Sequence, residues 1–439
     1  MATYATETEQ RPRAVVFAVL PGGQAAAEAD EEALAEIKEL LASAGIDWAA
    51  DVVQHRDRPH ARSYLFPGKL VELGDAVRRH GADVAVCEDD LTPGQVAAVL
   101  DAVDNIDVLD RTELILSVFA RHAHSLEGTL QVHLAQLEYE LTRMRGKGTI
   151  LSRLGAGVDM RGPGETKLEV DRRVVRGRIQ ALRRRIERMA QTRRTQRARR
   201  LRADLPLIAL AGYTNAGKST LLNALTGAEV SVRDRLFETL DPTTRVFRHR
   251  DRDFVLTDTV GFIRKLPHPL VDAFASTLEE TCIANLVLVV ADGHQTTGEI
   301  AARQDTVAEV LEMIGAVDVP RLTALNKVDL VDEPERTRLR ALYPDAVLIS
   351  ARNGEGLDRL LDRIADHFSR NLRSVRLLVP YADGGVVSRL RGVAADIREE
   401  STADGILVTV RLPESEACRY AHYAVHQSGS VGEPQEAQE

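Results

Sequence analysis

The sequence predicts an α/β protein made of four consecutive parts, and three patterns along its 439 residues support this. Short apolar runs alternate with helical patterns in residues 1–110 and again in residues 204–371, as in parallel sheets covered by helices. Residues 111–203 contain two long helical patterns that flank a glycine-rich segment. Residues 372–427 contain further short apolar runs and one helical pattern, which predict a small α+β domain.

The first domain, residues 1–110, is expected to form a small parallel sheet. Its apolar runs are short and lie between stretches with helical periodicity. The predicted strands are Val15–Leu20, Val84–Cys87 and Asn105–Leu109, and the predicted helices lie near Glu31–Ala44, Lys69–Arg79 and Pro93–Val103.

Residues 111–203 are expected to form an antiparallel helical hairpin that projects from the first domain. One long helix is predicted from Thr112 to Arg145, although Gly128 interrupts its pattern. Four glycines and one proline between Arg153 and Lys167 prevent a helix there and form the tip. In the second helix, apolar positions recur at intervals of 4, 3, 4 and 3 residues, a coiled-coil-like stripe. The stripe consists of Val175, Ile179, Leu182, Ile186 and Met189.

The second helix also concentrates basic charge in a chain that is acidic overall. Residues 172–202 contain 14 arginines and one acid, Glu187, and therefore carry +13, whereas the whole chain carries −9 and the remainder −22. Guanidinium groups bind phosphates in a bidentate manner, so this helix favours a defined contact with nucleic acid. The alternative is a solvated arginine face on a purely structural helical pair, and frequent arginine elsewhere in the chain weakens the nucleic-acid interpretation.

The last parts of the chain are a small module and a tail. Strands are predicted at Val375–Pro380, Gly392–Ile397 and Gly405–Val410, with a helical piece from Tyr381 to Leu390. Residues 428–439 are polar and are expected to be disordered.

A phosphate-binding loop is predicted at Gly212–Ser219, which reads GYTNAGKS and follows the apolar run Leu205–Ala211. Its glycines let backbone N–H groups face phosphate oxygens, Lys218 neutralises the outer phosphates and the charge of the transition state, and the Ser219 hydroxyl can coordinate Mg²⁺. An ordinary glycine turn is the alternative. The loop indicates a nucleoside triphosphate.

A guanine-binding motif follows 108 residues after Lys218, where Asn326-Lys327-Val328-Asp329 comes directly behind another apolar run. The Asp329 carboxylate can accept hydrogen bonds from guanine N1–H and the exocyclic amine, whereas adenine offers neither donor. An unpaired carboxylate against adenine costs roughly 1–3 kcal/mol, so GTP is favoured over ATP. We expect Asn326 to tie this loop to the phosphate loop and the Lys327 stem to lie along the base.

Three further segments complete the predicted nucleotide site of a P-loop GTPase domain. Asp258-Thr259-Val260-Gly261 ends a strand-like run, so Asp258 can hold Mg²⁺ through water and Gly261 can contact the γ-phosphate. Phe237–Asp241 is suited to a mobile switch whose Thr239 completes the magnesium shell, with Thr243 and Thr244 as alternatives. Ser350-Ala351-Arg352 can support the base through its backbone.

Phe262 occupies the position where many GTPases have a glutamine that orients the attacking water. Because phenylalanine cannot position water, we expect slow unaided hydrolysis that a partner accelerates. Packing of Phe262 and Ile263 beneath the switch is an alternative that is compatible with this expectation. No residue is assigned as the general base.

The composition argues against disulfide-rich, zinc-binding and membrane-spanning classes of protein. The hydrophobic content of 44% supports real cores, and Cys87, Cys282 and Cys418 lie far apart with no CxxC, which excludes a disulfide framework and a zinc signature. No apolar run approaches the ~18 residues of a membrane span, and the first ten residues are polar. A cytoplasmic protein is therefore expected.

These motifs, together with the tip RLGAGVDMRGPGETKLE, resemble those of HflX-type GTPases over most of the chain. Residues 110–116 and 131–137 are also similar to the family's N-terminal domain. Ala156 in the tip and Phe66-Pro67 depart from the glycines that relatives commonly have. Relatives also show hydrophobic residues after the DxxG glycine, so Phe262 is no departure. No second phosphate loop is present, and ATP binding by the first domain is not carried over.

The resemblance implies a GTP-dependent monomer that binds the large ribosomal subunit and its rRNA, and that splits or rescues stalled ribosomes with hydrolysis stimulated by the ribosome. A GTP-switched RNA-binding factor and a regulatory GTPase acting on a protein partner remain alternatives. Mg²⁺ is implied at Ser219 and Thr239. The implied nucleotide contacts are Gly212, Tyr213, Thr214, Asn215, Ala216, Gly217, Lys218, Ser219, Phe237, Glu238, Thr239, Leu240, Asp241, Asp258, Thr259, Val260, Gly261, Asn326, Lys327, Val328, Asp329, Ser350, Ala351 and Arg352. The candidate RNA contacts are Arg153, Arg161, Arg172, Arg173, Arg176, Arg183 and Arg184.

Overall fold

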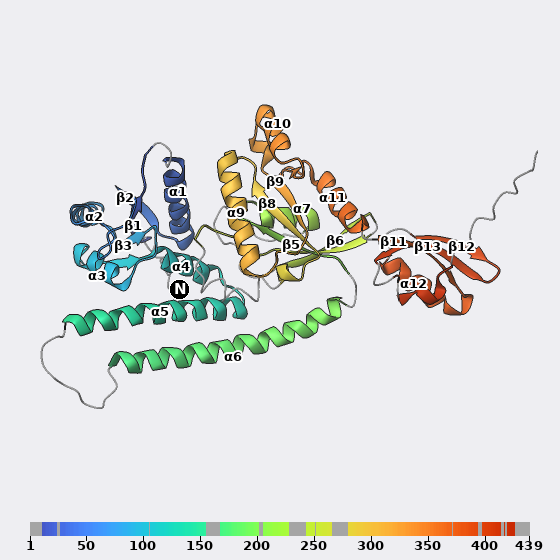
Figure 1. Ribbon diagram of the computed structural model, residues 1–439, viewed down its shortest axis with the longest axis horizontal. Helices are drawn as coiled ribbons and strands as arrows, with labels where there is room; N and C mark the ends of the chain where they lie inside the picture. The colour runs from blue at the N-terminus through green and yellow to red at the C-terminus, as the bar shows by residue number, and fades with distance from the viewer. Residues whose placement is uncertain are drawn as a thin grey trace, which may run out of the picture.

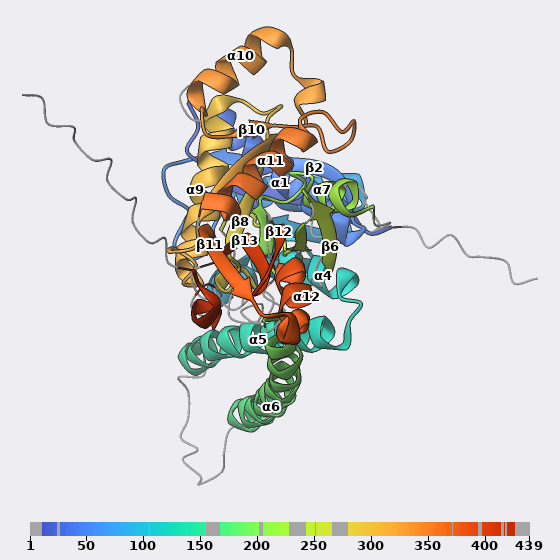
Figure 2. The same cartoon turned by 90° about the vertical axis from the view of Figure 1, so that its right-hand side faces the viewer.

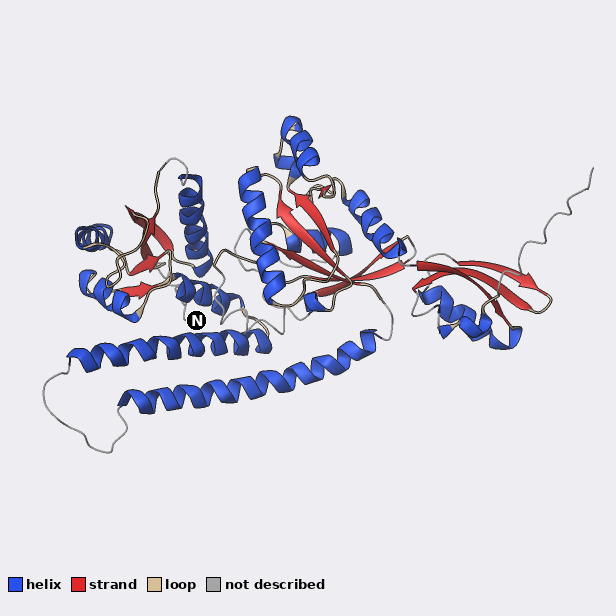
Figure 3. Ribbon diagram, in the orientation of Figure 1, coloured by secondary structure: helices blue, strands red, loops and turns tan. Residues whose placement is uncertain are grey.

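The computed structural model places three sheets in a row, with a long helical hairpin along one side of the first two (Figure 1; Figure 3). We call the three sheets with their helices the N-terminal, central and C-terminal units. This arrangement confirms the predicted fold class. The structure describes residues 11–23, 27–104, 106–154, 167–201, 205–227, 243–250, 252–265, 280–370, 372–393, 397–413, 417 and 419–425.

The N-terminal unit is a parallel sheet with the strand order β2-β1-β3-β4. Its strands are β1 (Arg13–Leu20), β2 (Asp47–His55), β3 (Val84–Cys87) and β4 (Asp107–Leu109), and its helices are α1 (Ala27–Ala44), α2 (Pro67–His80), α3 (Pro93–Ala102) and α4 (Arg111–His122). The sequence did not predict β2. Only Val52 of this edge strand is buried, so no apolar run marks it.

The predicted single helix from Thr112 to Arg145 is wrong, because two helices occupy this region. Helix α4 ends at His122, and α5 (Leu126–Leu154) begins after a short turn. The hydroxyl of Ser125 accepts a hydrogen bond from the N–H of Gly128 at 2.9 Å, as expected at a helix start. Gly128 therefore lies in the first turn of α5 and does not break the helix.

The hairpin pairs α5 with the 35-residue helix α6 (Lys167–Leu201), and both views show the two helices side by side (Figure 2). Leu134 and Leu137 of α5 pack against Val175 and Ile179 of α6, which confirms that the predicted stripe faces a partner helix. The predicted tip lies in residues 155–166, outside the described residues.

The central unit is a six-stranded sheet with the order β10-β9-β8-β5-β7-β6, parallel except for β6. All its parallel strands end at the same edge, where the predicted nucleotide motifs lie. The strands are β5 (Leu207–Gly212), β6 (Thr244–His249), β7 (Arg252–Thr257), β8 (Leu286–Asp292), β9 (Arg321–Asn326) and β10 (Val347–Leu348). Among the described residues of this unit, the helices are α7 (Lys218–Thr226), α9 (Thr297–Met313), α10 (Glu333–Leu342) and α11 (Leu357–Arg370).

The C-terminal unit is an antiparallel sheet of β11 (Leu372–Val379), β13 (Gly405–Pro413) and β12 (Ile397–Thr402), with helix α12 (Gly384–Val393). The predicted strand at Gly392–Ile397 is wrong, because Gly392 and Val393 end α12 and the strand begins at Ile397. Strand β12 reads IREEST and is largely exposed, so no apolar run marks it. The predicted tail, residues 428–439, lies outside the described residues.

The N-terminal and central units share one apolar core. Leu114 and Phe119 of α4 belong to the same buried cluster as Val289 of β8 and the side chains of Phe262 and Ile263. A shared core of this kind restrains the two units more strongly than a polar interface does. Within the described part of the chain, no helix is both long and apolar enough to cross a membrane.

Candidate functional site

The phosphate loop turns from β5 into α7 and presents the helix N-terminus. Gly217 is the residue before α7 and has a φ of +91°, where a side chain is strained. A Cβ there would also lie 2.2 Å from Nδ2 of Asn326. Glycine is thus required by both the backbone and the packing, and the free N–H groups of the helix start can face an anion.

Lys218 is buried beneath this loop. Its Nζ donates hydrogen bonds to the backbone oxygens of Gly212 at 3.0 Å and Tyr213 at 2.9 Å. Burial lowers the pKa of Lys218 to about 8, and the nearby carboxylate of Asp258 opposes this change. The ammonium is thus held where added phosphate charge would stabilise its protonated form.

Ser219 and Asp258 meet at the end of strand β7. The Ser219 hydroxyl donates to Oδ2 of Asp258 at 2.7 Å, and Asp258 is fully buried. A hydroxyl and a carboxylate in contact are hard oxygen donors, which fit Mg²⁺. The predicted third group, Thr239, belongs to the segment Phe237–Asp241, which lies outside the described residues.

Asn326 joins the base-binding loop to the phosphate loop, as predicted. Its Nδ2 donates to the backbone oxygen of Ala216 at 2.8 Å, and its Oδ1 accepts from the N–H of Ala351 at 2.9 Å. Asn326 is 3% exposed, so these bonds form away from water. One side chain therefore connects three of the predicted nucleotide segments.

The remaining base-side residues lie at the ends of β9 and β10. Lys327 adopts a left-handed conformation with a φ of 65°, and its Nζ contacts Oδ2 of Asp292 at 2.7 Å. Asp329 lies in the short turn after it and is half-buried. Ser350 is fully buried, and its hydroxyl accepts from the N–H of Asn353 at 3.2 Å, which shapes the loop beside the base position.

The segment after Gly261 lies directly against the phosphate loop. The N–H of Thr214 donates to the oxygen of Phe262 at 2.8 Å, and the N–H of Phe262 donates to the oxygen of Gly212 at 3.1 Å. A Cβ on Gly261 would meet Thr214 at 2.8 Å and Nζ of Lys218 at 3.1 Å. The side chain of Phe262 is 1% exposed and points into the shared core, so it packs there and does not face the phosphates.

Comparison with known proteins gives matches along most of the chain. Residues 31–120, 122–200 and 207–327 match family models described as GTP-binding GTPase N-terminal, GTP-binding GTPase Middle Region and 50S ribosome-binding GTPase. The GTPase HflX of Caldanaerobacter subterraneus subsp. tengcongensis is 44% identical over 92% of this chain and 91% of its own length. The GTPase HflX of Escherichia coli strain K12 is 40% identical over 88% of this chain and 90% of its own length. The chain belongs to the HflX family of GTPases.

A solved GTP-binding protein from Sulfolobus solfataricus in complex with GDP is also similar, with 25% identity, a TM-score of 0.43, and coverage of 81% of this chain and 98% of that one. Membership of the HflX family makes the chain a GTP-hydrolysing enzyme whose central unit binds GTP and GDP.

The arginines predicted to contact RNA in this HflX-family chain fall into three groups. Arg161 lies outside the described residues, as does the side chain of Arg153. Arg172 donates to the backbone oxygen of Met144 at 2.7 Å, and Arg183 pairs with Glu138 at 2.7 Å, so both also stabilise the hairpin. The others are exposed on α6, namely Arg173, Arg176 and Arg184.

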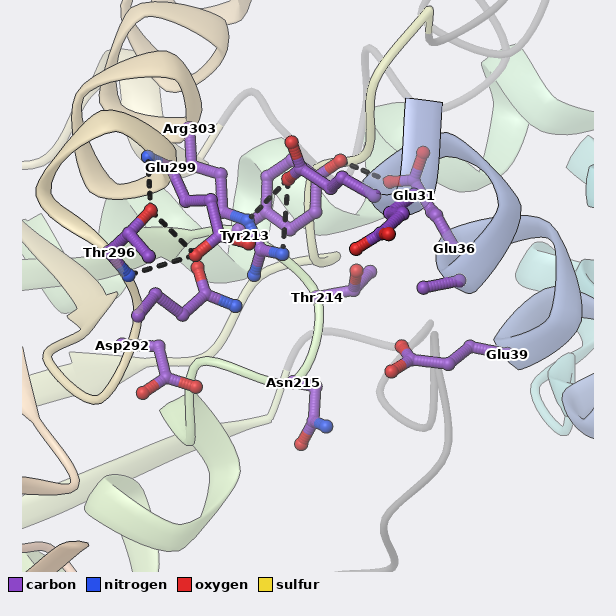
Figure 4. Close-up of a pocket in the computed structure, with 13 residues that line it drawn as sticks. Glu31, Glu36, Glu39, Tyr213, Thr214, Asn215, Asp292, Thr296, Glu299 and Arg303 are labelled. Atoms are coloured by element: carbon purple, nitrogen blue, oxygen red, sulfur yellow. Dashed lines mark hydrogen bonds and ion pairs between the residues drawn. The ribbon is translucent and has the colours of Figure 1, made fainter. Parts of the chain in front are cut away.

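A cleft of about 440 Å³ between the N-terminal and central units was not predicted (Figure 4). Glu31, Glu36 and Glu39 of α1 line one side, and Thr214 and Asn215 of the phosphate loop lie opposite. The glutamates of α1 and the phosphate-loop residues are separated by more than 170 residues in the sequence, so no local sequence pattern predicts that they lie close together. The only hint in the sequence is the density of acids in the first predicted helix.

Proposed function

We propose that this HflX-family GTPase is a cytoplasmic monomer that binds the large ribosomal subunit and splits or rescues stalled ribosomes. Its GTP hydrolysis is stimulated by the ribosome. The nucleotide is held by the phosphate loop, by Asp258–Gly261, by Asn326–Asp329 and by Ser350–Arg352, together with Phe237–Asp241. Ser219 and Thr239 hold Mg²⁺, which neutralises charge on the outer phosphates when it is bound.

The observation that carries the ribosomal part of the proposal is the arginine-bearing helix α6. Val175 and Ile179 face α5, while Arg173, Arg176 and Arg184 face solvent. An exposed row of guanidinium groups on a chain of net charge −9 suits a polyphosphate surface such as rRNA. The family model that matches residues 207–327 carries the description 50S ribosome-binding GTPase, which supports the same partner.

The dependence on a partner follows from Phe262. Glutamine at this position orients water in many GTPases, whereas the Phe262 side chain is buried in the core that joins two units. Because this side chain cannot turn toward the phosphates without emptying that core, the group that orders the water must come from elsewhere. A ribosomal surface that binds the hairpin can supply or order it.

The test is GTP turnover measured alone and with purified large ribosomal subunits. We expect strong stimulation by saturating subunits. Binding without stimulation would favour a GTP-switched binding factor with incidental hydrolysis, and no binding with either GTP or GDP would favour a protein partner. Both results would overturn the proposal.

A charge-matched pair of variants tests the role of the hairpin. We expect Arg176→Glu/Arg184→Glu to weaken subunit binding and to reduce the slope of log affinity against log salt by about 2, because two phosphate contacts are lost. The control is Arg389→Glu/Arg398→Glu, which makes the same charge change at exposed positions of the C-terminal unit. Equal losses in the two proteins would show a general charge effect and contradict a defined hairpin contact.

A further inference from the structure

The backbone of Arg264, three residues after Gly261, is held by hydrogen bonds on both sides of the residue. Its N–H donates to the hydroxyl of Tyr213 at 2.9 Å, and its carbonyl oxygen accepts from the guanidinium of Arg111 at 3.2 Å. Tyr213 belongs to the phosphate loop, whereas Arg111 belongs to α4 of the N-terminal unit. Residues from two units thus fix one short segment beside the nucleotide site.

Arg111 is itself held firmly. It is 1% exposed, and its guanidinium donates to Glu36 at 2.5 Å and to Glu88 at 3.4 Å. Burial opposes its charge, but Glu36 and Glu88 outweigh this effect and raise the pKa of Arg111 above its ordinary value. The guanidinium therefore stays charged, and its position is set by acids of the N-terminal unit.

The two hydrogen bonds that Tyr213 and Arg111 form with the Arg264 backbone are connected through Glu36. One of its carboxylate oxygens binds Arg111, and the other accepts a hydrogen bond from the Tyr213 hydroxyl. The connection Arg111–Glu36–Tyr213 closes a ring of hydrogen bonds around the Arg264 backbone. Buried rings of this kind hold their members in one arrangement because an unpaired member would be costly.

Lys265 adds a second link across the same boundary. Its Nζ pairs with Glu88 at 3.1 Å and with Asp89 at 2.5 Å, both at the end of β3. Asp89 is in turn bound by the Tyr64 hydroxyl at 2.7 Å. Two consecutive residues of the central unit are therefore attached to the N-terminal unit, one by its backbone and one by its side chain.

This attachment fixes where Gly261 lies. The Gly261 backbone packs against Thr214 and Nζ of Lys218, the group that neutralises the outer phosphates. The DxxG motif predicts that the Gly261 N–H contacts the γ-phosphate, and GDP has no γ-phosphate to contact. Anything that holds this segment in place thus favours GTP over GDP.

We propose that Arg111 and Glu36 of the N-terminal unit are positioning residues for the γ-phosphate contact, acting through the backbone of Arg264. Without these hydrogen bonds, the segment from Gly261 to Lys265 moves away from the phosphate loop. GTP then binds more weakly and is hydrolysed more slowly, whereas the affinity for GDP is unchanged. The inference goes beyond the proposed function, because it concerns the isolated protein and needs no ribosome.

The experiment measures the affinities of the full-length protein for GDP and for a non-hydrolysable GTP analogue, together with single-turnover GTP hydrolysis. A hydrogen bond from a charged group is worth about tenfold in an equilibrium constant. We expect Arg111→Met to weaken the analogue about tenfold and slow hydrolysis about tenfold, with GDP affinity unchanged. Arg111→Lys should recover part of the loss.

Two other variants test the same inference if replacement of the buried Arg111 prevents folding. Tyr213→Phe removes the hydrogen bond to the Arg264 N–H without burying a charge, and Lys265→Met removes a half-exposed partner. Both should lower the ratio of GTP-analogue affinity to GDP affinity. The control is Arg121→Met on the same helix, whose guanidinium bonds only the oxygen of Ala44 among the described residues.

A merely structural role predicts a different result. Partial unfolding lowers the fraction of active protein for both nucleotides equally and leaves their affinity ratio unchanged. An unchanged ratio in folded Arg111→Met, Tyr213→Phe and Lys265→Met proteins would overturn the inference, as would faster hydrolysis in any of them.

Discussion

Replacement of Asn326 by alanine tests the connection between the base-binding loop and the phosphate loop. In the structure, this side chain satisfies two buried backbone groups, the oxygen of Ala216 and the N–H of Ala351. Alanine removes both bonds, and no water enters readily because Asn326 is 3% exposed. The perturbation therefore leaves one acceptor and one donor buried without partners.

The expected magnitude follows from those two groups. Each unsatisfied buried group costs about 1–3 kcal/mol, so the free energy of unfolding should fall by about 2–6 kcal/mol. For a protein part of this size, that corresponds to a decrease of about 5–25 °C in the melting temperature of the central unit. GDP affinity should fall at least about tenfold, because the loops that Asn326 joins lose their fixed spacing.

Thermal unfolding of the ligand-free protein and calorimetric titration with GDP measure the two effects separately. Asn353→Ala is the control, since it removes the same carboxamide from an exposed position in the loop after β10. Gly217→Ala should disrupt the contact between Asn326 and the phosphate loop by a change in the phosphate loop, because the new Cβ would lie 2.2 Å from Nδ2 of Asn326. If Asn326→Ala behaves like Asn353→Ala in both assays, the reasoning is refuted.

Three further outcomes are expected. Burial holds the pKa of Lys218 at about 8 without nucleotide, and bound phosphates raise it, so GTP affinity is greatest below pH 8 and falls about fourfold from pH 7 to 8.5; titration calorimetry checks this, and a slope that persists in Lys218→Arg would contradict it. Asp329→Asn should weaken GTP by about 2 kcal/mol, or roughly 30-fold, and shift preference toward xanthine nucleotides; competition binding measures this, and unchanged GTP affinity would disprove the base contact. Phe262→Gln should lower the melting temperature and leave unaided hydrolysis slow, because the amide enters an apolar core; faster single-turnover hydrolysis would show that this position can face the phosphates.

The parts of the fold that were predictable have local signals. Apolar runs found β1, β3, β5 and β9, since each of these strands is buried along most of its length or at its carboxyl end. Strands β2 and β12 lie at sheet edges, and only Val52 of β2 and no residue of β12 is buried, so pairing with a neighbour and not burial defines them. The turn between α4 and α5 has little local signal, because Ser125 is the capping residue and Gly128 lies within the first turn of α5.

The nucleotide segments were predictable for a different reason. Each is a short contiguous motif, and parallel strands bring their carboxyl ends to one edge without further information. The ring of hydrogen bonds around the Arg264 backbone has no such sequence signal, because Glu36, Arg111 and Tyr213 come from three distant parts of the chain. A buried arginine in the sequence D-R-T-E looks like an ordinary helix start, and only its tertiary partners distinguish it.

The burial of Phe262 links the core shared by the two units to the hydrolytic site. The residue after the DxxG glycine is the natural place for a water-orienting side chain, yet here its ring is buried with Phe119 of the N-terminal unit. Arg264 and Lys265, the second and third residues after it, are anchored to that unit as well. The segment therefore contributes packing but no water-orienting side chain at this position. Burial of Phe262 in the chain's own interior is therefore the physical reason for the proposed stimulation by a partner, because the group that orders the attacking water does not come from this position.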